Sequence, residues 1–227
     1  NGFATASGVK VVPVISGIET GFALPPMEAF EKLITPKTKA IIPVHFAGRP
    51  CDMDAIHSIA REHGLIVIED GAHALGSVYK GKKVGSMSDM TTFSFHPVKI
   101  ITTGEGGMAM TNDPQLAKTM RLLRSHGITR DPADFINEPD GPWYYEQQML
   151  GFNYRMTDIQ AAIAREQLKK LPEFIFRRAN IFKKYQEAGL PVIDSIRQDV
   201  KPVRFRAVIF TDSKKVISCQ NALLESG

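Results

Sequence analysis

Short apolar runs that alternate with helix-like segments constrain the fold of this 227-residue chain more than any other feature. The runs expected to form strands are residues 9–15, 40–46, 65–69, 90–95 and 107–111. The segments with helical spacing of apolar residues are 26–34, 52–63 and 114–126. The run 65–69 is apolar almost throughout, as expected of a sheet covered on both faces. This alternation predicts an α/β domain with a mixed, mainly parallel sheet.

The last hundred residues follow a different pattern. Residues 128–150 are rich in proline and glycine, which predicts a long functional or mobile loop. Residues 155–189 are strongly helical, and Pro172 predicts either a kink or two helices. A strand over 202–211 and a helix over 214–225 are expected to follow. We therefore expect a large domain over residues 1–155, with connecting helices and part of a small α+β domain over 156–227.

Charge and composition exclude several classes of protein. The chain has 28 Lys and Arg against 24 Asp and Glu, without a basic block, which disfavours a nucleic-acid binder. No apolar run reaches the roughly 20 residues that span a bilayer, so we expect a cytoplasmic protein without a membrane partner. The spacing of Cys51 and Cys219 does not suit a metal site, and free thiols are expected, although one long-range disulfide stays open.

Chemically useful side chains follow two of the expected strands. Asp70 directly follows the run 65–69. At the end of a buried strand, a carboxylate stays ionised only beside a cation or several donors. A protonated heterocyclic nitrogen is such a cation; the alternative is that Asp70 caps a turn. Lys99 follows the run 90–95, and an amine in a partly desolvated site attacks aldehydes. The alternative is an ordinary surface lysine. Ser94, just before Lys99, carries a hydroxyl that can bind a phosphate oxygen.

A third group opens the long helical region. Asn153 and Arg155 lie beside the expected start of that helix, and a helix N-terminus is a natural site for an anion. The alternative is ordinary capping of the helix by Asn153 or Thr157. The ligands of open α/β sheets bind beyond the carboxyl ends of the strands. We therefore expect Asp70, Ser94 and Lys99 to share one site.

Three segments, in this order, resemble the DegT/DnrJ/StrS family of sugar aminotransferases. They read VIEDGAHALG, SFHPVKIITTGEGG and LGFNYRMTDIQAAIA. The resemblance covers about residues 3–190 and implies the aspartate-aminotransferase fold with pyridoxal 5′-phosphate as cofactor. The strings RSHGITRDP and PWYYEQQMLGFNYRMTDIQ resemble one branch of the family most. That branch aminates the 4-keto carbon of a UDP-linked 4-keto-6-deoxy amino sugar on the way to pseudaminic acid.

The resemblance implies a role for each matching residue. Lys99 matches the lysine that bonds covalently to pyridoxal phosphate, and Asp70 matches the carboxylate that pairs with its pyridine nitrogen. His73 matches a position against the cofactor ring, and Ser94 matches a phosphate ligand. Asn153 matches a residue that reaches the cofactor phosphate of a partner subunit, which implies a homodimer with shared sites.

Substrate binding is implied less directly. Side chains expected to meet the nucleotide diphosphate or the sugar are Arg124, His126, Arg130, Tyr145 and Arg155, although each also suits an ordinary surface position. The family implies glutamate as amino donor and 2-oxoglutarate as its product. Other family members act on dTDP- or GDP-linked sugars or at a 3-keto carbon, and these alternatives stay open.

The chain departs from the family pattern at both ends. Its first residue, Asn1, follows the point where the family has a Ser-Gly-Thr turn that holds the cofactor phosphate, and residues 204–227 resemble the family less. Two interpretations follow. The chain is a piece of a longer enzyme, or it is a shortened, non-catalytic relative that acts as a binding or structural subunit. A regulator is disfavoured because no DNA-binding segment is visible.

Overall fold

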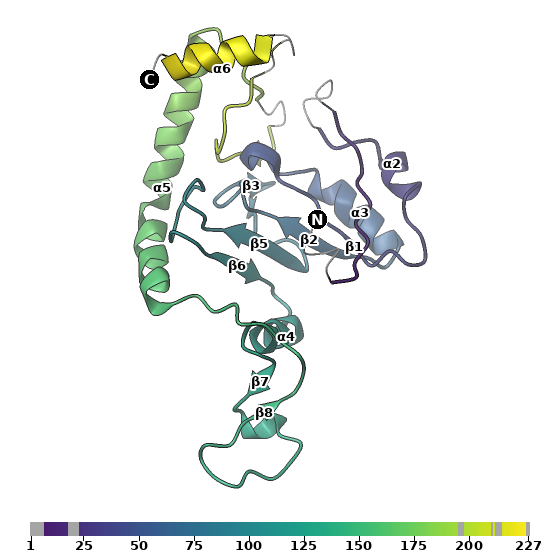
Figure 1. Cartoon of the computed structure of the whole chain (residues 1–227). Helices are drawn as coiled ribbons and strands as arrows, with labels where there is room; N and C mark the ends of the chain where they lie inside the picture. The colour runs from purple at the N-terminus through teal and green to yellow at the C-terminus, as the bar shows by residue number, and fades with distance from the viewer. Residues whose placement is uncertain (1–6, 18–22, 195–197, 210, 212–214, 226–227) are drawn as a thin grey trace.

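The computed structural model describes residues 7–17, 23–194, 198–209, 211 and 215–225 (Figure 1). Its helices are α2 (Met27–Glu31), α3 (Met53–Glu62), α4 (Pro114–Arg124), α5 (Asp158–Glu187) and α6 (Val216–Glu225), with 3-10 turns η2 (Phe46–Gly48) and η3 (Pro132–Asp134). Its strands are β1 (Ala40–Ile41), β2 (Ile66–Asp70), β3 (Val78–Tyr79), β4 (Lys82–Lys83), β5 (Met90–Ser94), β6 (Gly107–Met110), β7 (Ile128–Thr129), β8 (Glu146–Gln147) and β9 (Val200–Lys201). No helix among the described residues is long and apolar enough to cross a bilayer.

The central sheet has the order β1-β2-β5-β6 (Figure 1). β1, β2 and β5 run parallel, and β6 returns antiparallel to β5. This arrangement confirms the expected mixed, mainly parallel α/β sheet. Helix α3 packs on it, because Met53, Ile56 and Ile59 recur at helical spacing and are buried with Val67 of β2. Asp52 caps α3 by accepting the N–H of Ala55, as its sequence position predicts.

Helix α5 and the segment after it cover a second part of the core. Leu171 and Phe174 of α5 pack against a buried cluster that contains Phe93 and Phe95. Strand β9 pairs antiparallel with β3, which brings residues beyond α5 back onto the first half of the chain. The division into domains at residues 155 and 156 stays a prediction.

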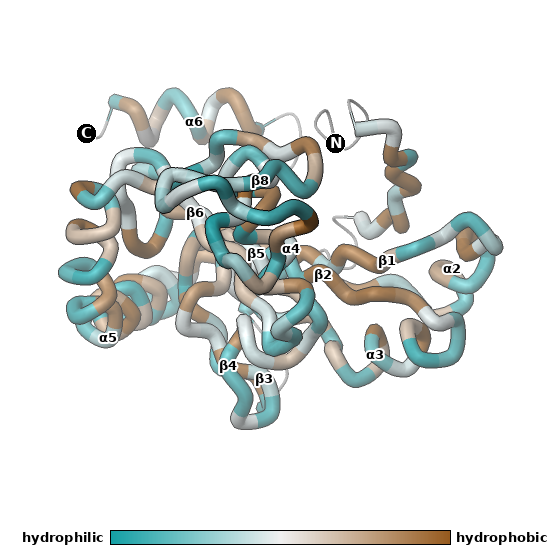
Figure 2. The backbone as a smooth tube through the Cα atoms, turned by 90° about the horizontal axis from the view of Figure 1, so that it is seen from below, coloured by the Kyte–Doolittle hydropathy of each residue, from teal (hydrophilic) through white to brown (hydrophobic). Residues whose placement is uncertain are grey.

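The opposite face of the central sheet is less covered than expected. Ile66 of β2 is exposed, and so is Val44, which forms a parallel bridge with Asp70 on the same face. Figure 2 shows that the chain along β1 and β2 is largely hydrophobic. For the described residues, the expectation of a sheet buried on both faces is therefore wrong.

Two of the expected strands do not form. Residues 9–15 are extended without ladder pairing, and Val9 and Ile15 are exposed. Pro13, in the middle of this segment, has no N–H to donate to a neighbouring strand. Beyond Pro202 the chain leaves the ladder of β9, and only an isolated bridge between Val192 and Ile209 lies within the expected strand 202–211, whose residue 210 is outside the described ranges.

Helix α5 runs through Pro172 as one helix, so the alternative of two helices is wrong. Pro172 lies on the exposed side of α5, where the carbonyl that lacks its partner faces solvent. The start of α5 is fixed by a capping box in which Thr157 accepts the N–H of Gln160 and the Gln160 side chain accepts the N–H of Thr157.

Residues 125–153 form an arm that projects from the sheet, below it in Figure 1. The arm contains the antiparallel pair β7 and β8, so the expected loop has some regular structure. Its base is a tight crossing: Gly127 has a φ of +69°, and a Cβ there would lie 1.8 Å from the carbonyl oxygen of Met149. Only glycine fits this position.

Candidate functional site

Asp70 is the last residue of β2, at the carboxyl end of the parallel strands. Its Oδ1 accepts the backbone N–H of Ala72 at 3.0 Å, so the carboxylate caps the following turn. Its other oxygen has no hydrogen-bond partner among the described residues. The turn-capping interpretation is therefore confirmed for one oxygen. It is compatible with cation binding, which stays a prediction, because the second oxygen is left for a ligand.

A buried, hydrogen-bonded pair of side chains lies directly behind Asp70. His45 and Glu69 are both fully buried, and His45 Nε2 donates to Glu69 Oε2 at 2.7 Å. His45 Nδ1 accepts the N–H of Cys51 at 3.1 Å, which fixes the tautomer. Burial raises the pKa of Glu69, but hydrogen bonds from His45 and Ser88 outweigh it, so the net pKa is lowered.

The backbone segments that carry His45 and Glu69 are also hydrogen-bonded to each other at Asp70. The N–H of Asp70 donates to the carbonyl of Pro43 at 2.9 Å, and the N–H of His45 donates to the carbonyl of Asp70 at 3.2 Å. The segment after β1 is thereby fixed against the end of β2. Sequence reasoning did not single out His45 or Glu69, because a lone histidine and a carboxylate 24 residues apart give no spacing signal.

Lys99 lies in the connection between β5 and β6, and backbone hydrogen bonds join the two ends of this connection. Ser94, the last residue of β5, pairs with Gly107, the first residue of β6. The N–H of Phe95 donates to the carbonyl of Gly106 at 2.8 Å. Lys99 is half-buried beside the buried Ile100, and its amine has no hydrogen-bond or carboxylate partner among the described residues. An unpaired, partly desolvated amine suits the predicted nucleophile.

His73 follows Asp70 in the turn after β2, and its ring stacks on Phe205 with centroids 4.3 Å apart and an interplanar angle of 23°. Its Nδ1 is buried and has no hydrogen-bond partner in the described part of the chain. Burial lowers the pKa of His73, the positive charges of Lys99 and Arg206 lower it further, and Asp70 partly opposes them. His73 and Lys99 both contact the ring of Phe205, and Asp70 precedes His73 by three residues, so these three residues lie near one another, while their roles stay predictions.

Phe205 is the centre of contacts that sequence reasoning missed. Its ring is buried, and the Lys99 Nζ lies 5.2 Å from the ring centroid. The guanidinium groups of Arg178 and Arg206 lie 5.9 and 5.2 Å from the same centroid. The sequence does alternate here between apolar and charged residues, which is typical of an extended segment with one buried face. In the structure, Val203 and Phe205 are buried, Arg204 is partly buried and Arg206 is exposed.

The residues present fit pyridoxal phosphate in kind. A carboxylate, an amine, a hydroxyl and a flat imidazole lie at one end of the sheet, and the turn at residues 104–107 lets backbone approach a ligand closely. The buried Nδ1 of His73 is a polar atom that the described residues leave unsatisfied. The face of His73, however, is covered by the ring of Phe205.

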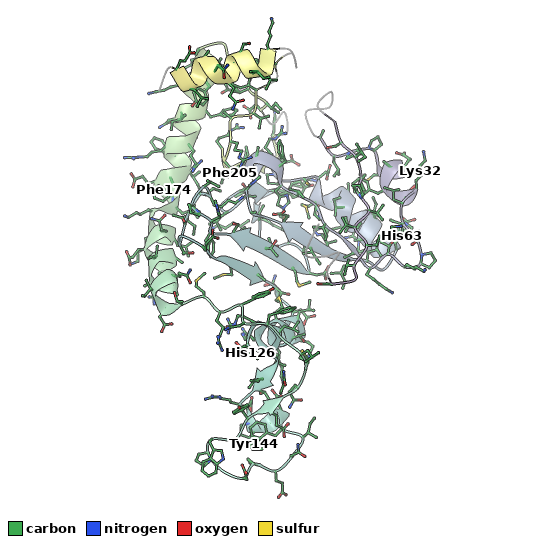
Figure 3. All side chains as sticks on the ribbon, viewed as in Figure 1. Lys32, His63, His126, Tyr144, Phe174 and Phe205 are labelled. Atoms are coloured by element: carbon green, nitrogen blue, oxygen red, sulfur yellow. The ribbon has the colours of Figure 1, made fainter. Side chains whose placement is uncertain are left out.

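The remaining predicted residues lie on the arm or directly beside its two ends. Figure 3 shows His126 and Tyr144 on the arm, below the sheet, while Phe205 lies above the sheet near α5. Asn153 is exposed at the base of the arm, where it forms a bridge with Ser125. No contact between Asn153 and Lys99 is recorded among the described residues.

Four further predicted residues belong to the same region. Arg124 ends α4, and its carbonyl accepts the N–H of Tyr154 at 2.9 Å. The Arg130 guanidinium lies 5.8 Å from the Tyr145 ring centroid, which brings these two side chains together. Arg155 is exposed ahead of α5. The substrate-binding roles of these residues stay predictions.

A cavity of about 1000 Å³ lies at the other end of the sheet. It is lined by residues of α3 and by Asp89 and Asp113, which lie beside the amino end of β5, and none of the candidate site residues lines it. No group of His, Cys, Asp or Glu in the described ranges could hold a metal ion. Cys51 and Cys219 are both free, and burial raises the pKa of Cys51 to about 12.

Comparison with known proteins gives consistent matches. GDP-perosamine synthase from Caulobacter vibrioides is 50% identical over 157 residues, which are 69% of this chain and 39% of that protein. The structure of Helicobacter pylori PseC, an aminotransferase of pseudaminic acid biosynthesis, matches with a TM-score of 0.83 and 33% identity over 99% of this chain and 58% of that one. Spr1654 from Streptococcus pneumoniae, in its PMP form, matches with a TM-score of 0.88 and 29% identity over 100% and 63%.

The curated relatives are longer than the region that matches this chain. The chain spans about two fifths of the length of the curated relatives it matches. The profile of the DegT/DnrJ/EryC1/StrS aminotransferase family matches residues 3–225, which extends past the expected residues 3–190 and includes the segment that carries Phe205. On the strength of this match and of the relatives above, the chain belongs to the DegT/DnrJ/EryC1/StrS aminotransferase family.

Proposed function

We propose that this chain carries the cofactor-binding core of a pyridoxal-phosphate-dependent sugar aminotransferase. Aminotransferases of this family depend on pyridoxal phosphate, and Spr1654 was solved in both PLP and PMP forms. The observation that carries the proposal is the meeting of Asp70, His73 and the unpaired amine of Lys99 beyond the carboxyl ends of β2 and β5. A lone lysine would not support it.

Each residue has a defined task in this proposal. Bound pyridoxal phosphate supplies an electron sink for charge that develops on the carbon bearing the amine. The free oxygen of Asp70 holds a proton on the pyridine nitrogen, and Ser94 binds the phosphate. The Lys99 amine would take the proton from the α-carbon of the amino donor, as a general base. It would then deliver a proton to the C4′ carbon of the cofactor, as a general acid.

The substrate class rests on the relatives. We infer that glutamate donates the amine and that a nucleotide-linked keto sugar accepts it at the 4-keto carbon. The likeness to PseC, an aminotransferase of pseudaminic acid biosynthesis, favours the UDP-linked 4-keto-6-deoxy amino sugar that the sequence resemblance implies. The name GDP-perosamine synthase supports a GDP-linked sugar equally well, so a panel of UDP-, dTDP- and GDP-linked keto sugars is the direct test.

We also propose a homodimer with shared sites. Asn153 is exposed at the base of the arm, which projects from the sheet. A residue exposed on a projecting arm suits contact with the site of a second copy. The arm residues Arg124, His126, Arg130 and Tyr145, and Arg155 beside it, would then bind nucleotide sugar across the interface.

Absorbance spectroscopy with pyridoxal phosphate, before and after addition of glutamate, tests the proposal. Borohydride trapping followed by peptide mapping is expected to place the adduct on Lys99, and glutamate is expected to convert the spectrum to that of pyridoxamine phosphate. Lys99→Ala removes the adduct and keeps the fold, because the Lys99 amine has no hydrogen-bond partner among the described residues.

The matched control is Lys83→Ala, because Lys83 lies exposed on β4. This variant is expected to trap cofactor as the parent does. Adducts confined to surface lysines, in a chain that circular dichroism shows to be folded, would contradict the proposal and favour the non-catalytic subunit.

A further inference from the structure

The position of the Lys99 amine depends on the backbone that carries it, because the amine has no hydrogen-bond or carboxylate partner among the described residues. That backbone is closed into a loop, since the N–H of Thr103 donates to the carbonyl of Phe95 at 3.0 Å. The Thr102 hydroxyl donates to the same carbonyl at 3.1 Å. Inside the loop, the N–H of Lys99 donates to the carbonyl of His96 at 2.9 Å. A contact that holds Thr103 therefore also holds the loop of Lys99.

Thr103 is fixed by the turn that follows it. Its side chain belongs to a residue that is 4% exposed, and its hydroxyl donates to the carbonyl of Glu105 at 2.8 Å. Gly106 packs so closely that a Cβ there would lie 2.4 Å from the Thr103 hydroxyl oxygen. The Glu105 carbonyl is thus the acceptor that holds Thr103 in place.

The Glu105 carbonyl also accepts a hydrogen bond from outside the connection. The Gln160 Nε2, 55 positions later in the sequence, donates to it at 2.8 Å. The Gln160 Oε1 accepts the N–H and the hydroxyl of Thr157, both at 3.0 Å. Only the oxygen of this carboxamide belongs to the capping box of α5, and its nitrogen serves a different partner.

An apolar contact joins the same two segments. Met156, which precedes α5, packs against the buried cluster that contains Phe95 and Ile101. Its Cε lies 3.1 Å from the position that a Cβ of Gly106 would take. The start of α5 is therefore docked on the connection that carries Lys99 by one polar and one apolar contact.

We infer that Gln160 is a positioning residue for Lys99, because its carboxamide nitrogen links the start of α5 to the loop that holds the amine. This inference rests on the proposed function, which makes the Lys99 amine the group that reacts with the cofactor. A capping box needs only an acceptor at this position, and glutamate supplies one as well as glutamine does. The donor that Gln160 directs at Glu105 is the feature that capping does not explain.

Three variants separate the cap from the link to Glu105. Gln160→Glu keeps an oxygen that accepts the N–H of Thr157 but replaces the donor to the Glu105 carbonyl by a second acceptor. Gln160→Ala removes both interactions and adds no charge. Thr157→Ala is the matched control, because it removes the hydroxyl that accepts the N–H of Gln160 and leaves the Gln160 Nε2 in place.

Amide hydrogen exchange, recorded without cofactor, is the first measurement. In Gln160→Glu and Gln160→Ala, the N–H of Thr103 is expected to exchange about tenfold faster than in the parent, since the Glu105 carbonyl loses one of the two donors that hold it. In Thr157→Ala, exchange is expected to accelerate at Gln160 and to stay unchanged at Thr103.

The rate of adduct formation on Lys99 is the second measurement, with borohydride quenching at timed intervals over a range of pyridoxal phosphate concentrations. In both Gln160 variants the limiting rate at saturating cofactor is expected to fall about tenfold, because the amine is less often aligned, while the half-saturating concentration changes less than about twofold. A loss of folded protein would lower the amount of adduct and leave this rate unchanged. Thr157→Ala is expected to match the parent.

Each of four results would overturn the inference. Parental exchange at Thr103 and a parental limiting rate in both Gln160 variants remove the positioning role and leave the proposed function standing. A slow rate in Gln160→Glu alone assigns the effect to its added charge, and an equally slow rate in Thr157→Ala assigns it to the helix cap. A parent chain that traps no cofactor on Lys99 overturns the proposed function and, with it, the role of Gln160.

Discussion

At the scale of single residues, the buried pair of His45 and Glu69 makes a sharp prediction. Glu69→Gln keeps the shape of the side chain but removes the charge that faces His45 at 2.7 Å. We expect it to lower the free energy of unfolding by about 1–3 kcal/mol, measured by urea denaturation at pH 7. Glu173→Gln is the control, because Glu173 forms an exposed ion pair with Arg177 on α5, and little change is expected there.

The same pair gives the pH dependence a definite sign. The pKa of Glu69 is lowered from its ordinary value of 4.5, so the folded state favours the ionised carboxylate. Its contribution to stability is therefore complete above pH 4.5 and is lost as the pH falls below that value. Glu69→Gln is expected to flatten this part of the stability profile, and a profile as steep as that of the parent would contradict the assignment.

The residues of the site could be predicted from the sequence only where a motif carried them. Asp70, His73, Ser94 and Lys99 lie in motifs, and the charges that act on His73 place Asp70 and Lys99 beside it. Phe205 lies 132 positions after His73, by the numbering, in a segment without a motif. Its contact with His73 is set by tertiary packing, which a local pattern does not encode.

At the scale of elements, the arm depends on one carboxylate. Glu146 of β8 accepts hydrogen bonds from the backbone N–H groups of Ile136 and Asn137 and from the side chains of Asn137, Tyr144 and Gln148. Led by the N–H of Ile136, these donors lower the pKa of Glu146 to about 2. The order that Glu146 gives the arm is therefore present above pH 4.5 and is lost as the pH falls toward 2.

Substitution of this carboxylate is expected to loosen the arm without unfolding the sheet. Glu146→Gln introduces an NH₂ group among donors, so amide hydrogen exchange at Ile136 and Asn137 should accelerate at least about tenfold while exchange in β2 and β5 stays unchanged. Glu138→Gln, an exposed change in the same arm, is the control. Unaltered exchange at Ile136 in Glu146→Gln would show that the arm is ordered by other contacts.

The helices were easier to predict than the strands, for a physical reason. α3 and α5 carry their own caps, Asp52 and Thr157, and their apolar faces follow from spacing alone. A strand exists only where a neighbour accepts its hydrogen bonds. The segment 9–15 has β-branched residues but no such neighbour, and β9 ends before Pro202, so β propensity alone predicted both segments wrongly.

At the scale of the whole molecule, shared sites predict complementation between two defective chains. Lys99→Ala and Asn153→Ala each lower the cofactor trapped on Lys99. In a mixed dimer, one site combines Lys99 of one chain with Asn153 of the other. Random mixing after unfolding and refolding is expected to restore about a quarter of the parental sites, because half of the dimers are mixed and each has one intact site.

The measurement is cofactor content after borohydride trapping, with each variant refolded alone as its own control. No recovery on mixing, with dimers confirmed by light scattering, would contradict sharing of Asn153. The sequence predicts shared sites only through the family resemblance. The spacing of Lys99 and Asn153 along the chain does not show that they serve different sites.

The pairing of residues 200–203 with the first half of the chain has a consequence for the order of folding. Val200 and Lys201 pair with β3, and the Val203 N–H donates to the hydroxyl of Ser77, which lies 126 positions earlier in the sequence. Contacts between segments this far apart close a long loop, and the entropy of loop closure opposes their formation until the intervening chain is ordered. These contacts are therefore expected to form after the local contacts of α3 and α5.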